Sequence, residues 1–575
     1  MMLPCVFRRL SGLALALLTL AAAAPEAGPA GPENTPPRPA RNRYQTSGHF
    51  GAFLDGRFAM AQGDLDIAAA SFLRALEADP RNTELVQPAF IACLLAGRAE
   101  AVRLARRLPD VQAAQLLLLN QDFKAGKWEA AEERIRALPR RGVLASLSPL
   151  LSAWAAQGAG RTDAALAILA PLTQTHQLRA FHALHAALIA DLAGRGPEAA
   201  RFYRVAQAEV GAGNIRLAQI VASWHARQGR LAEAGQTLRA LGEGGEEYPL
   251  AVSALLAQAT RRPVARAAEG VAEAYLGIAA LGGREQQGGD TLAPLLRLAI
   301  EIRPDLTPAR ILLAEQFEIT RRYGAGLDIL APIGADDPLA GLARLRRAAL
   351  LERLERTEEA LAELERLARD YPDSPMAQAQ VGDILRVKQR FGEAVSAYDK
   401  AIARAASGRP ENWRLFYARG IAHDRSGNWQ KAERDLQRAL ELQPDHPYVL
   451  NYLGYSWADQ NRRLPEARAL LERAMERKPN DGAITDSMGW VLYRMGDIPG
   501  AIRLLERAVE LQPEDAVINF HLGDAYWAAG RKREAQFQWR RALLMNPEPG
   551  DREKLEAKLR EHGEAAELAA PARVQ

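Results

Sequence analysis

The chain has 575 residues, of which 48% are hydrophobic, 25% charged and only 6% aromatic. Lys plus Arg (74) exceed Asp plus Glu (70) by a net charge of +4, a surplus too small over this length to indicate a nucleic-acid-binding protein. The composition is typical of a helical protein, and the length allows several ordinary domains or one elongated array.

The N-terminus contains an apolar stretch, LSGLALALLTLAAAA, directly after Arg8 and Arg9. This stretch is too short to span a bilayer comfortably and ends in small residues, so it predicts a secretory signal peptide over residues 1–23. An uncleaved signal anchor is the alternative. Cys5 precedes the apolar stretch, so no lipid-attachment cysteine stands at the predicted cleavage point.

A proline-rich segment follows at residues 24–43, and its composition predicts a disordered, fairly stiff spacer. With Cys5 removed, Cys93 is the one cysteine left in the sequence, so no intrachain disulfide is expected. Cys93 lies in the apolar run FIACLLAG, which favours a small core residue over a nucleophile.

From Tyr44 onward, amphipathic runs alternate with short Gly- or Pro-marked turns, and no strand is predicted. Glycines recur at spacings of 38, 34, 35 and 34 residues, at Gly382, Gly420, Gly454, Gly489 and Gly523. Alanines follow them after 12 or 13 residues, at Ala394, Ala432, Ala467, Ala501 and Ala535, and prolines close four units, at Pro444, Pro479, Pro513 and Pro547. The segment 51–80 repeats the same order with Gly56, Ala68, Ala75 and Pro80.

This period resembles the tetratricopeptide repeat. The resemblance implies an all-α, right-handed superhelical solenoid of antiparallel helix pairs with a concave groove. We expect repeats over residues 44–240 and 291–547, strongest over 376–547, and a degenerate helical segment with a loop over 241–290. Residues 548–575 are expected to form a charged capping helix and tail.

The repeat pattern also predicts local contacts. Small residues such as Gly454 and Ala467 are expected where the two helices of a pair cross closely. Glycines in the left-handed conformation are expected to end first helices, at Gly427, Gly496 and Gly530. After the closing prolines, Asp445 and Asn480 are candidates for N-caps.

Catalytic and cofactor motifs are not found in the sequence: no phosphate-binding loop, no zinc-protease motif and no paired cysteines. Residues 454–457, GYSW, superficially resemble a nucleophile elbow but are expected within a helix. His182 and His185 are three residues apart and share a helix face, which could serve a metal, although packing between repeats is the favoured interpretation. We therefore predict no metal site and no cofactor.

The resemblance also implies which side chains line the groove, because first helices of tetratricopeptide repeats carry the inward positions. These positions hold aromatic, arginine and acidic side chains, a composition typical of binding hot spots. They are Arg414, Tyr417, Asp424, Arg425, Tyr448, Asn451, Tyr455, Asp459, Asp486, Trp490, Tyr493, Arg494, Phe520, Asp524 and Trp527. Trp429 and Trp539, on second helices, are expected to pack between helices.

The leading hypothesis is a non-enzymatic scaffold in the periplasm that binds a protein or peptide and recruits an envelope protease or peptidoglycan hydrolase. The alternative is a protein that binds an extended glycan or polysaccharide strand. An enzyme hidden in residues 240–290 is the third hypothesis. Binding of chaperone tails through a carboxylate clamp is disfavoured, because the position that requires asparagine holds Asp383, Ile421, Tyr455, Trp490 and Asp524.

Overall fold

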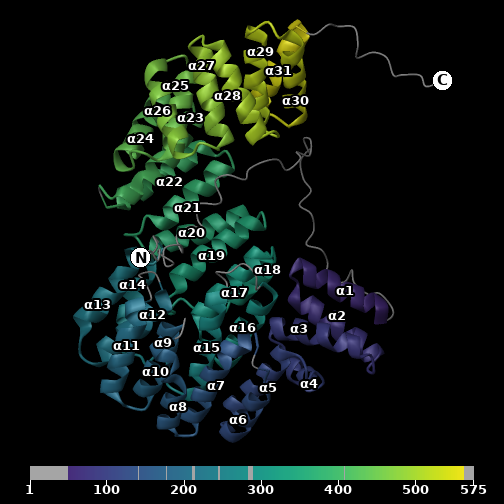
Figure 1. Cartoon of the computed structure of the whole chain (residues 1–575), viewed down its shortest axis with the longest axis vertical. Coiled ribbons are helices and arrows are strands. Elements are labelled where there is room, and N and C mark those ends of the chain that lie inside the picture. Colours follow the sequence, from purple (N-terminus) through teal and green to yellow (C-terminus); the bar gives the residue numbers. More distant parts are fainter. Residues whose placement is uncertain are drawn as a thin grey trace, which may run out of the picture. The chain divides into compact units, whose positions relative to one another are not determined.

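A computed structural model describes residues 49–139, 141–175, 178–209, 214–243, 247–282, 289–406 and 408–562. Within these ranges the chain forms α-helices and short 3-10 turns and has no strand, so the predicted all-α class is confirmed (Figure 1). The predicted signal peptide, the proline-rich spacer and residues 283–288 of the predicted loop lie outside the described residues. The chain divides into two compact units, the first ending at Ala377 and the second beginning at Gln378.

Unit 1 consists of twenty α-helices within its described part. Their bounds are α1 His49–Gln62, α2 Leu65–Ala78, α3 Val86–Ala96, α4 Glu100–Ala105, α5 Gln112–Lys124, α6 Trp128–Ala137, α7 Val143–Gly158, α8 Thr162–Leu169, α9 Leu172–Thr175, α10 Arg179–Leu192, α11 Gly196–Glu209, α12 Ile215–Arg227, α13 Leu231–Arg239, α14 Pro249–Ala257, α15 Ala267–Gly282, α16 Gly289–Ile302, α17 Thr307–Ile319, α18 Tyr323–Leu330, α19 Ala340–Arg353 and α20 Thr357–Asp370.

Unit 2 continues with helix pairs and ends with a single helix. The bounds are α21 Met376–Val387, which begins at the boundary between the units, α22 Phe391–Arg404, α23 Trp413–Arg425, α24 Trp429–Leu442, α25 Pro447–Asp459, α26 Leu464–Arg477, α27 Gly482–Arg494, α28 Ile498–Leu511, α29 Ala516–Ala528, α30 Lys532–Leu544 and α31 Pro549–His562. The predicted capping helix is therefore α31, and residues 563–575 lie outside the described part.

Small residues mark the helix crossings in unit 2, as the repeat pattern predicts. A Cβ added to Gly454 would lie 3.1 Å from the carbonyl oxygen of Ala467, and one added to Gly523 would lie 3.2 Å from that of Ala535. Both alanines are fully buried. The backbone of the second helix thus approaches the first so closely that any larger side chain at the glycine would push the pair apart.

Helix ends follow the prediction at their glycines but not at two of their caps. Gly427, Gly496 and Gly530 have positive φ angles of 77°, 86° and 79°, as the left-handed cap requires. The predicted N-caps Asp445 and Asn480 are wrong by one residue, because the N-caps of α25 and α27 are His446 and Asp481. The Asp445 carboxylate instead accepts hydrogen bonds from Arg473 and Arg477 of α26.

Helices α15 and α16 pack against the first helices of earlier pairs in unit 1 rather than only against their sequence neighbours. α15 contacts α5, α7 and α10, and α16 contacts α3 and α5. The Asn120 side chain of α5 joins both, because it accepts a hydrogen bond from the Tyr275 hydroxyl (3.0 Å) and donates one to the Leu298 carbonyl (3.1 Å). Every residue from 270 to 276 is buried, so α15 is covered on all sides.

This all-round burial gives a physical reason why residues 240–290 match the repeat period so poorly. In a repeat, the small residues of a helix lie on one face, against one closely packed neighbouring helix. Helix α15 packs closely against several helices, so it needs small residues on more than one face. A Cβ added to Gly270 would lie 2.2 Å from the Trp154 ring of α7, and one added to Gly277 would lie 2.1 Å from the Phe181 ring of α10. Glycines set by these contacts do not fall on the 34-residue spacing.

Candidate interaction surface

The fifteen side chains predicted to line the groove lie on α23, α25, α27 and α29, the first helices of four successive pairs in unit 2. We call the face that they form the inward surface. Its exposure decreases along the chain: residues of α23 are mostly half-buried, whereas every residue from 484 to 492 of α27 and from 518 to 526 of α29 is buried. The inward surface therefore has an accessible part on α23 and α25 and a covered part on α27 and α29.

Four predicted groove residues are covered, which corrects the expectation that they face solvent. Asp486, Trp490, Phe520 and Asp524 are between 4% and 8% exposed. The Trp490 ring stacks on Tyr493, with centroids 4.9 Å apart and planes at 13°, and on His521, at 4.0 Å and 15°. Its indole Nε1 has no hydrogen-bond partner among the described residues.

The structure contains a buried ion pair next to Trp490 that the sequence did not predict. His521 Nδ1 donates to both carboxylate oxygens of Asp486, at 3.0 and 2.9 Å, and both side chains are about 5% exposed. Burial alone lowers the pKa of His521, but the adjacent Asp486, with help from Asp524 and Asp459, outweighs burial and raises that pKa above its usual value. His521 is therefore the cation of this pair.

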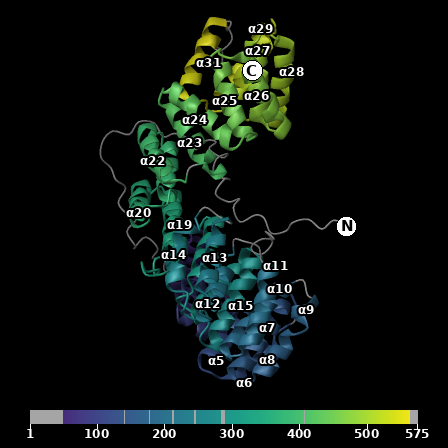
Figure 2. The ribbon, with the colours of Figure 1, turned by 90° about the vertical axis from the view of Figure 1, so that its left-hand side faces the viewer.

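Helix α31 covers the second half of the inward surface. Arg425 of α23 pairs with Glu548, the residue just before α31, at 3.1 Å. Lys558 Nζ lies 3.2 Å from the Asp524 carboxylate and 5.7 Å from the Phe520 ring centroid. Contacts at both ends of α31 thus reach α23 and α29, and α31, drawn in yellow in Figure 2, also packs against α30.

The end of α31 completes this contact. The His562 ring stacks on Trp527 with centroids 4.3 Å apart, and Leu555 is fully buried in the same apolar cluster as Trp490 and Phe520. Asp524 itself has a raised pKa because burial outweighs Lys558 and the hydrogen bond from the Trp539 indole. Trp539 is fully buried and Trp429 partly buried between helices, as predicted.

The accessible part contains an aromatic cluster with basic neighbours. The Trp413 ring contacts His446 with centroids 3.9 Å apart and planes tilted by 34°, and it contacts Tyr417 at 6.0 Å, while His446 contacts Tyr448 at 5.9 Å. Arg414 lies over the Trp413 ring, and Lys478 donates to the Tyr448 hydroxyl at 2.7 Å. We call Trp413, Arg414, Tyr417, His446 and Tyr448 the α23–α25 cluster.

The pKa values of this cluster keep its rings neutral. Burial, together with Arg414 and Lys478, lowers the pKa of His446 to about 4, so its ring is neutral at physiological pH. Burial raises the pKa of Tyr417 to about 12. The cluster therefore presents neutral aromatic rings with basic side chains packed against them, a composition typical of protein-binding surfaces.

The remaining predicted residues lie between these two parts. Asp424 accepts a hydrogen bond from the Tyr452 hydroxyl at 2.8 Å, and Arg494 donates to the Asp459 carbonyl at 3.1 Å. Tyr455 is half-buried beside His521, with ring centroids 6.0 Å apart, and Asn451 Oδ1 is buried without a hydrogen-bond partner among the described residues. Residues 454–457 lie within α25, as predicted.

His182 and His185 lie in the core of unit 1, each about 1% exposed. His185 Nδ1 accepts a hydrogen bond from the Trp154 indole at 3.0 Å, and burial lowers its pKa to about 3. Across the described ranges, no group of three or more His, Cys, Asp or Glu side chains is placed to hold a metal ion. Cys93 is also fully buried, and burial raises the pKa of its thiol to about 11, as expected of a core residue.

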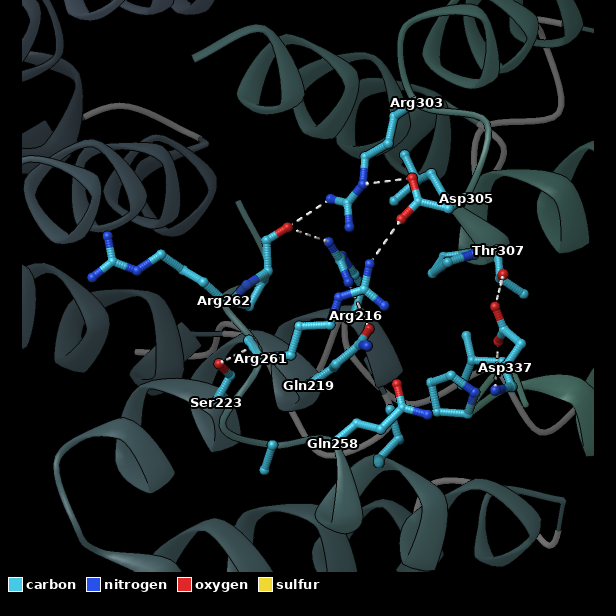
Figure 3. Close-up of a pocket in the computed structure, with 17 residues that line it drawn as sticks. Arg216, Gln219, Ser223, Gln258, Arg261, Arg262, Arg303, Asp305, Thr307 and Asp337 are labelled. Atoms are coloured by element: carbon cyan, nitrogen blue, oxygen red, sulfur yellow. Dashed lines mark hydrogen bonds and ion pairs between the residues drawn. The ribbon is translucent and has the colours of Figure 1, made fainter. Parts of the chain in front are cut away.

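A pocket in unit 1 brings several arginines together and is a second candidate for a ligand site (Figure 3). Arg216 and Arg303 both pair with the buried carboxylate of Glu273, and Arg303 also donates to the Pro263 carbonyl at 2.6 Å. Arg261 lies 3.5 Å from Asp305. Arg303 also lies 3.3 Å from Asp305, so the three arginines share two carboxylates and each is already ion-paired.

Comparisons with known proteins place repeats in the second half of the chain. Residues 417–482 and 487–551 match the family described as tetratricopeptide repeat, and residues 324–415 match the tetratricopeptide repeat-like domain. The TPR repeat-containing protein PA4667 of Pseudomonas aeruginosa is 31% identical over 195 residues, which are 33% of this chain and 31% of that protein. Tetratricopeptide repeat protein 13 of Homo sapiens is 31% identical over 128 residues, 22% of this chain and 14% of that protein.

The chain thus spans less than a third of the length of these curated relatives. Solved structures with similarity include YrrB, described as a TPR protein with an unusual peptide-binding site, at 22% identity and a TM-score of 0.27 over 34% of this chain and 92% of YrrB. The Cut9–Hcn1 hetero-tetramer of the APC/C has 15% identity and a TM-score of 0.35 over 90% of this chain and 97% of that one.

Proposed function

We propose that the protein, whose residues 417–482 and 487–551 match the tetratricopeptide repeat and whose residues 324–415 match a repeat-like domain, is a non-enzymatic scaffold that binds a protein or peptide on the inward surface of unit 2. The α23–α25 cluster is the observation that carries this proposal. Aromatic rings and arginine supply large contact areas with little loss of conformational entropy, and they are enriched at the centres of protein interfaces.

The geometry of the cluster favours a macromolecular ligand over a small molecule. The contacts run across two helices, from Trp413 on α23 to Tyr448 on α25. Asn451 and Tyr455 follow Tyr448 along α25 at steps of three and four residues, so they share its helix face. Its rings are half-buried, so their edges form a continuous face instead of a closed cavity. An extended or helical segment of a partner fits such a face, because it can contact several rings at once.

The cellular setting is a finer part of the proposal and depends on the N-terminal sequence. Residues 1–23 have the features of a secretory signal, and the described helices include none long and apolar enough to cross a membrane. We place the scaffold in the bacterial envelope, where it would recruit an enzyme such as a protease or peptidoglycan hydrolase. A fusion of residues 1–48 to a periplasm-dependent reporter tests the export step by itself.

Affinity capture of a partner from envelope extract tests the binding function. The test variant is Arg414→Ala with Tyr448→Ala, two half-buried residues of the cluster, and the matched control is Arg434→Ala with Arg438→Ala on the exposed side of α24. We expect a stoichiometric protein partner with the wild type and the control and its loss with the test variant. Equal recovery from all three proteins would contradict the assignment of this surface.

Polysaccharide binding predicts a different result in the same experiment. If the aromatic rings stack on sugars, purified peptidoglycan strands would retain the wild type and the control but not the Arg414→Ala, Tyr448→Ala variant. Recovery of glycan without protein would replace the scaffold proposal with the glycan-binding alternative, because both predict the same surface but different ligands.

A further inference from the structure

Helix α31 presents one face to the inward surface. Glu548, Asp551, Leu555, Lys558 and His562 are spaced by 3, 4, 3 and 4 residues, the spacing of a single helical stripe. Four of these residues have contacts in the structure: Glu548 with Arg425, Leu555 with the apolar cluster, Lys558 with Asp524, and His562 with Trp527. The fifth, Asp551, pairs with Lys554 of the same helix at 2.8 Å.

The charges on this stripe match the surface beneath it. Its first residue is acidic and lies against the basic Arg425, and its basic Lys558 lies against the acidic Asp524. These two contact residues of the stripe are ten positions apart, which corresponds to about 15 Å along a helix. The inward surface therefore distinguishes the two directions of a bound helix by the positions of its charges.

The attachment of α31 has few apolar contacts. Among residues 549–562, Leu555 is the one buried residue, and Leu559 packs partly buried against the same cluster. The Gln536 amide of α30 donates to the His562 carbonyl at 2.6 Å, and at the other end the paired Arg425 and Glu548 side chains are 41% and 63% exposed. Exposed ion pairs add little net stability because water competes for both charges. A segment held in this way can leave the surface without unfolding the pairs below it.

From these observations we propose that α31 is an internal competitor for the inward surface, and that the partner is a protein or peptide segment forming an amphipathic helix of the same pattern. That pattern is an acidic residue, an apolar residue seven positions later and a basic residue ten positions later. The inference rests on the proposed function, since it identifies the kind of partner that takes the place of α31.

A labelled peptide with the sequence of residues 548–562 tests the competition in the full chain. Lys558→Glu repels α31 from Asp524, and Arg560→Glu makes the same charge change on the exposed side of α31. We expect the peptide to bind the Lys558→Glu chain at least about tenfold more tightly than the wild type, because its own α31 no longer competes. The Arg560→Glu chain should bind it like the wild type.

A charge exchange tests the direction of the bound helix. Arg425→Glu changes an exposed side chain and is not expected to affect folding. Placed in the Lys558→Glu chain, it should weaken binding of the natural peptide, and a peptide carrying Glu548→Arg should restore the binding. Equal affinity of the natural peptide for wild type, Lys558→Glu and Arg560→Glu would overturn the inference, and so would failure of the exchanged peptide to restore binding.

The two proposals can fail separately. If the Lys558→Glu chain captures its partner from extract no better than the Arg560→Glu chain, although the wild type captures it through the α23–α25 cluster, then α31 is a permanent cap and the inference is wrong alone. If the peptide binds as expected but no chain captures a partner, then the proposed scaffold function is wrong and the competition of α31 stands.

Discussion

The two units cover the inward faces of their first helices in different ways. In unit 1, α15 and α16 lie against α3, α5, α7 and α10, and seven consecutive residues of α15, 270–276, are buried. In unit 2 the covering element is α31, which buries Leu555, packs Leu559 against the same cluster and makes its other contacts through charged and polar side chains. One covering is apolar and close-packed, and the other is a single charged helix.

This difference indicates which unit can give up its covering to bind a partner. Removing α15 from unit 1 would expose the Trp154 and Phe181 rings against which its own glycines, at 270 and 277, are packed. Displacing α31 costs about 2–3 kcal/mol for the buried Leu555 and about 0–1 kcal/mol for the exposed Arg425–Glu548 pair, and it also uncovers apolar side chains of the cluster and Asp524. An external helix with similar contacts can supply that free energy, so the inward surface of unit 2 is the one suited to exchange.

The buried His521 of unit 2 gives the largest expected effect on stability. His521→Leu leaves the Asp486 carboxylate, 4% exposed, without its cation. We expect this to destabilise unit 2 by about 3–5 kcal/mol, the usual cost of breaking a buried ion pair. Native-state hydrogen exchange of α27 and α29 measures it, because exchange reports each unit separately. The double variant His521→Leu, Asp486→Leu should recover most of the loss, and a double variant as unstable as the single one would contradict the explanation.

Packing of α15 gives the next largest effect, in unit 1. The new Cβ in Gly270→Ala would lie 2.2 Å from the Trp154 ring, which is fixed by its hydrogen bond to His185. We expect a loss of about 3 kcal/mol, at the upper end of the range for overpacked cores. Gly324→Ala in α18 is the control, because no atom lies within 4 Å of its added Cβ. Equal denaturation curves for both variants would show that α15 is not close-packed.

The pH dependence of the two units should have opposite signs at these histidines. The pKa of His185 in the folded state is about 3, below its ordinary 6.5, so protonation at low pH favours the unfolded chain. We expect unit 1 to lose about 2 kcal/mol between pH 7 and pH 5. His185→Gln should remove this loss, because glutamine can accept the Trp154 hydrogen bond without titrating. An unchanged pH profile in that variant would contradict the assignment.

His521 contributes in the other direction, because its folded-state pKa is raised above 6.5 by Asp486 and its acidic neighbours despite burial. Its stabilising contribution is fully present below the unfolded pKa and is lost as the pH rises through the raised pKa. Hydrogen exchange of α29 should therefore quicken above neutral pH, beyond the intrinsic rate, in the wild type. The His521→Leu, Asp486→Leu variant should lack this component.

The sequence predicts the fold of unit 2 closely and its inward surface only in part. Period and residue size place Gly454 against Ala467 and the left-handed glycines at helix ends, since those features depend on one neighbouring helix. The same reasoning placed Trp490 in solvent, because its exposure depends on α31, some sixty residues further along the chain. The His521–Asp486 pair spans two repeats and has no signal in the pattern of either one.

Unit 1 was less predictable for the same physical reason. The contact of α15 with α7 joins residues more than a hundred positions apart, so the glycines at 270 and 277 follow distant rings instead of the repeat spacing. The α23–α25 cluster was predicted in part. The inward positions gave Arg414, Tyr417 and Tyr448, but Trp413 and His446, whose rings are in contact, occupy positions that the family pattern does not mark.

The smallest expected effect concerns the ion pair at the start of α31. Arg425→Gln removes a pair whose side chains are both more than 40% exposed, so the protection of α31 amides should fall by no more than about 1 kcal/mol. Salt at about 1 M ionic strength should also lower the protection of α31 amides in the wild type, because it screens the exposed charges. The same salt should lower that protection less in the Arg425→Gln variant. Amides of α15 are the internal control: apolar packing and the buried ion pairs of Glu273 hold that helix, and buried pairs are screened little, so salt should not loosen it. Salt-dependent exchange in α15 equal to that in α31 would remove the distinction between the two coverings.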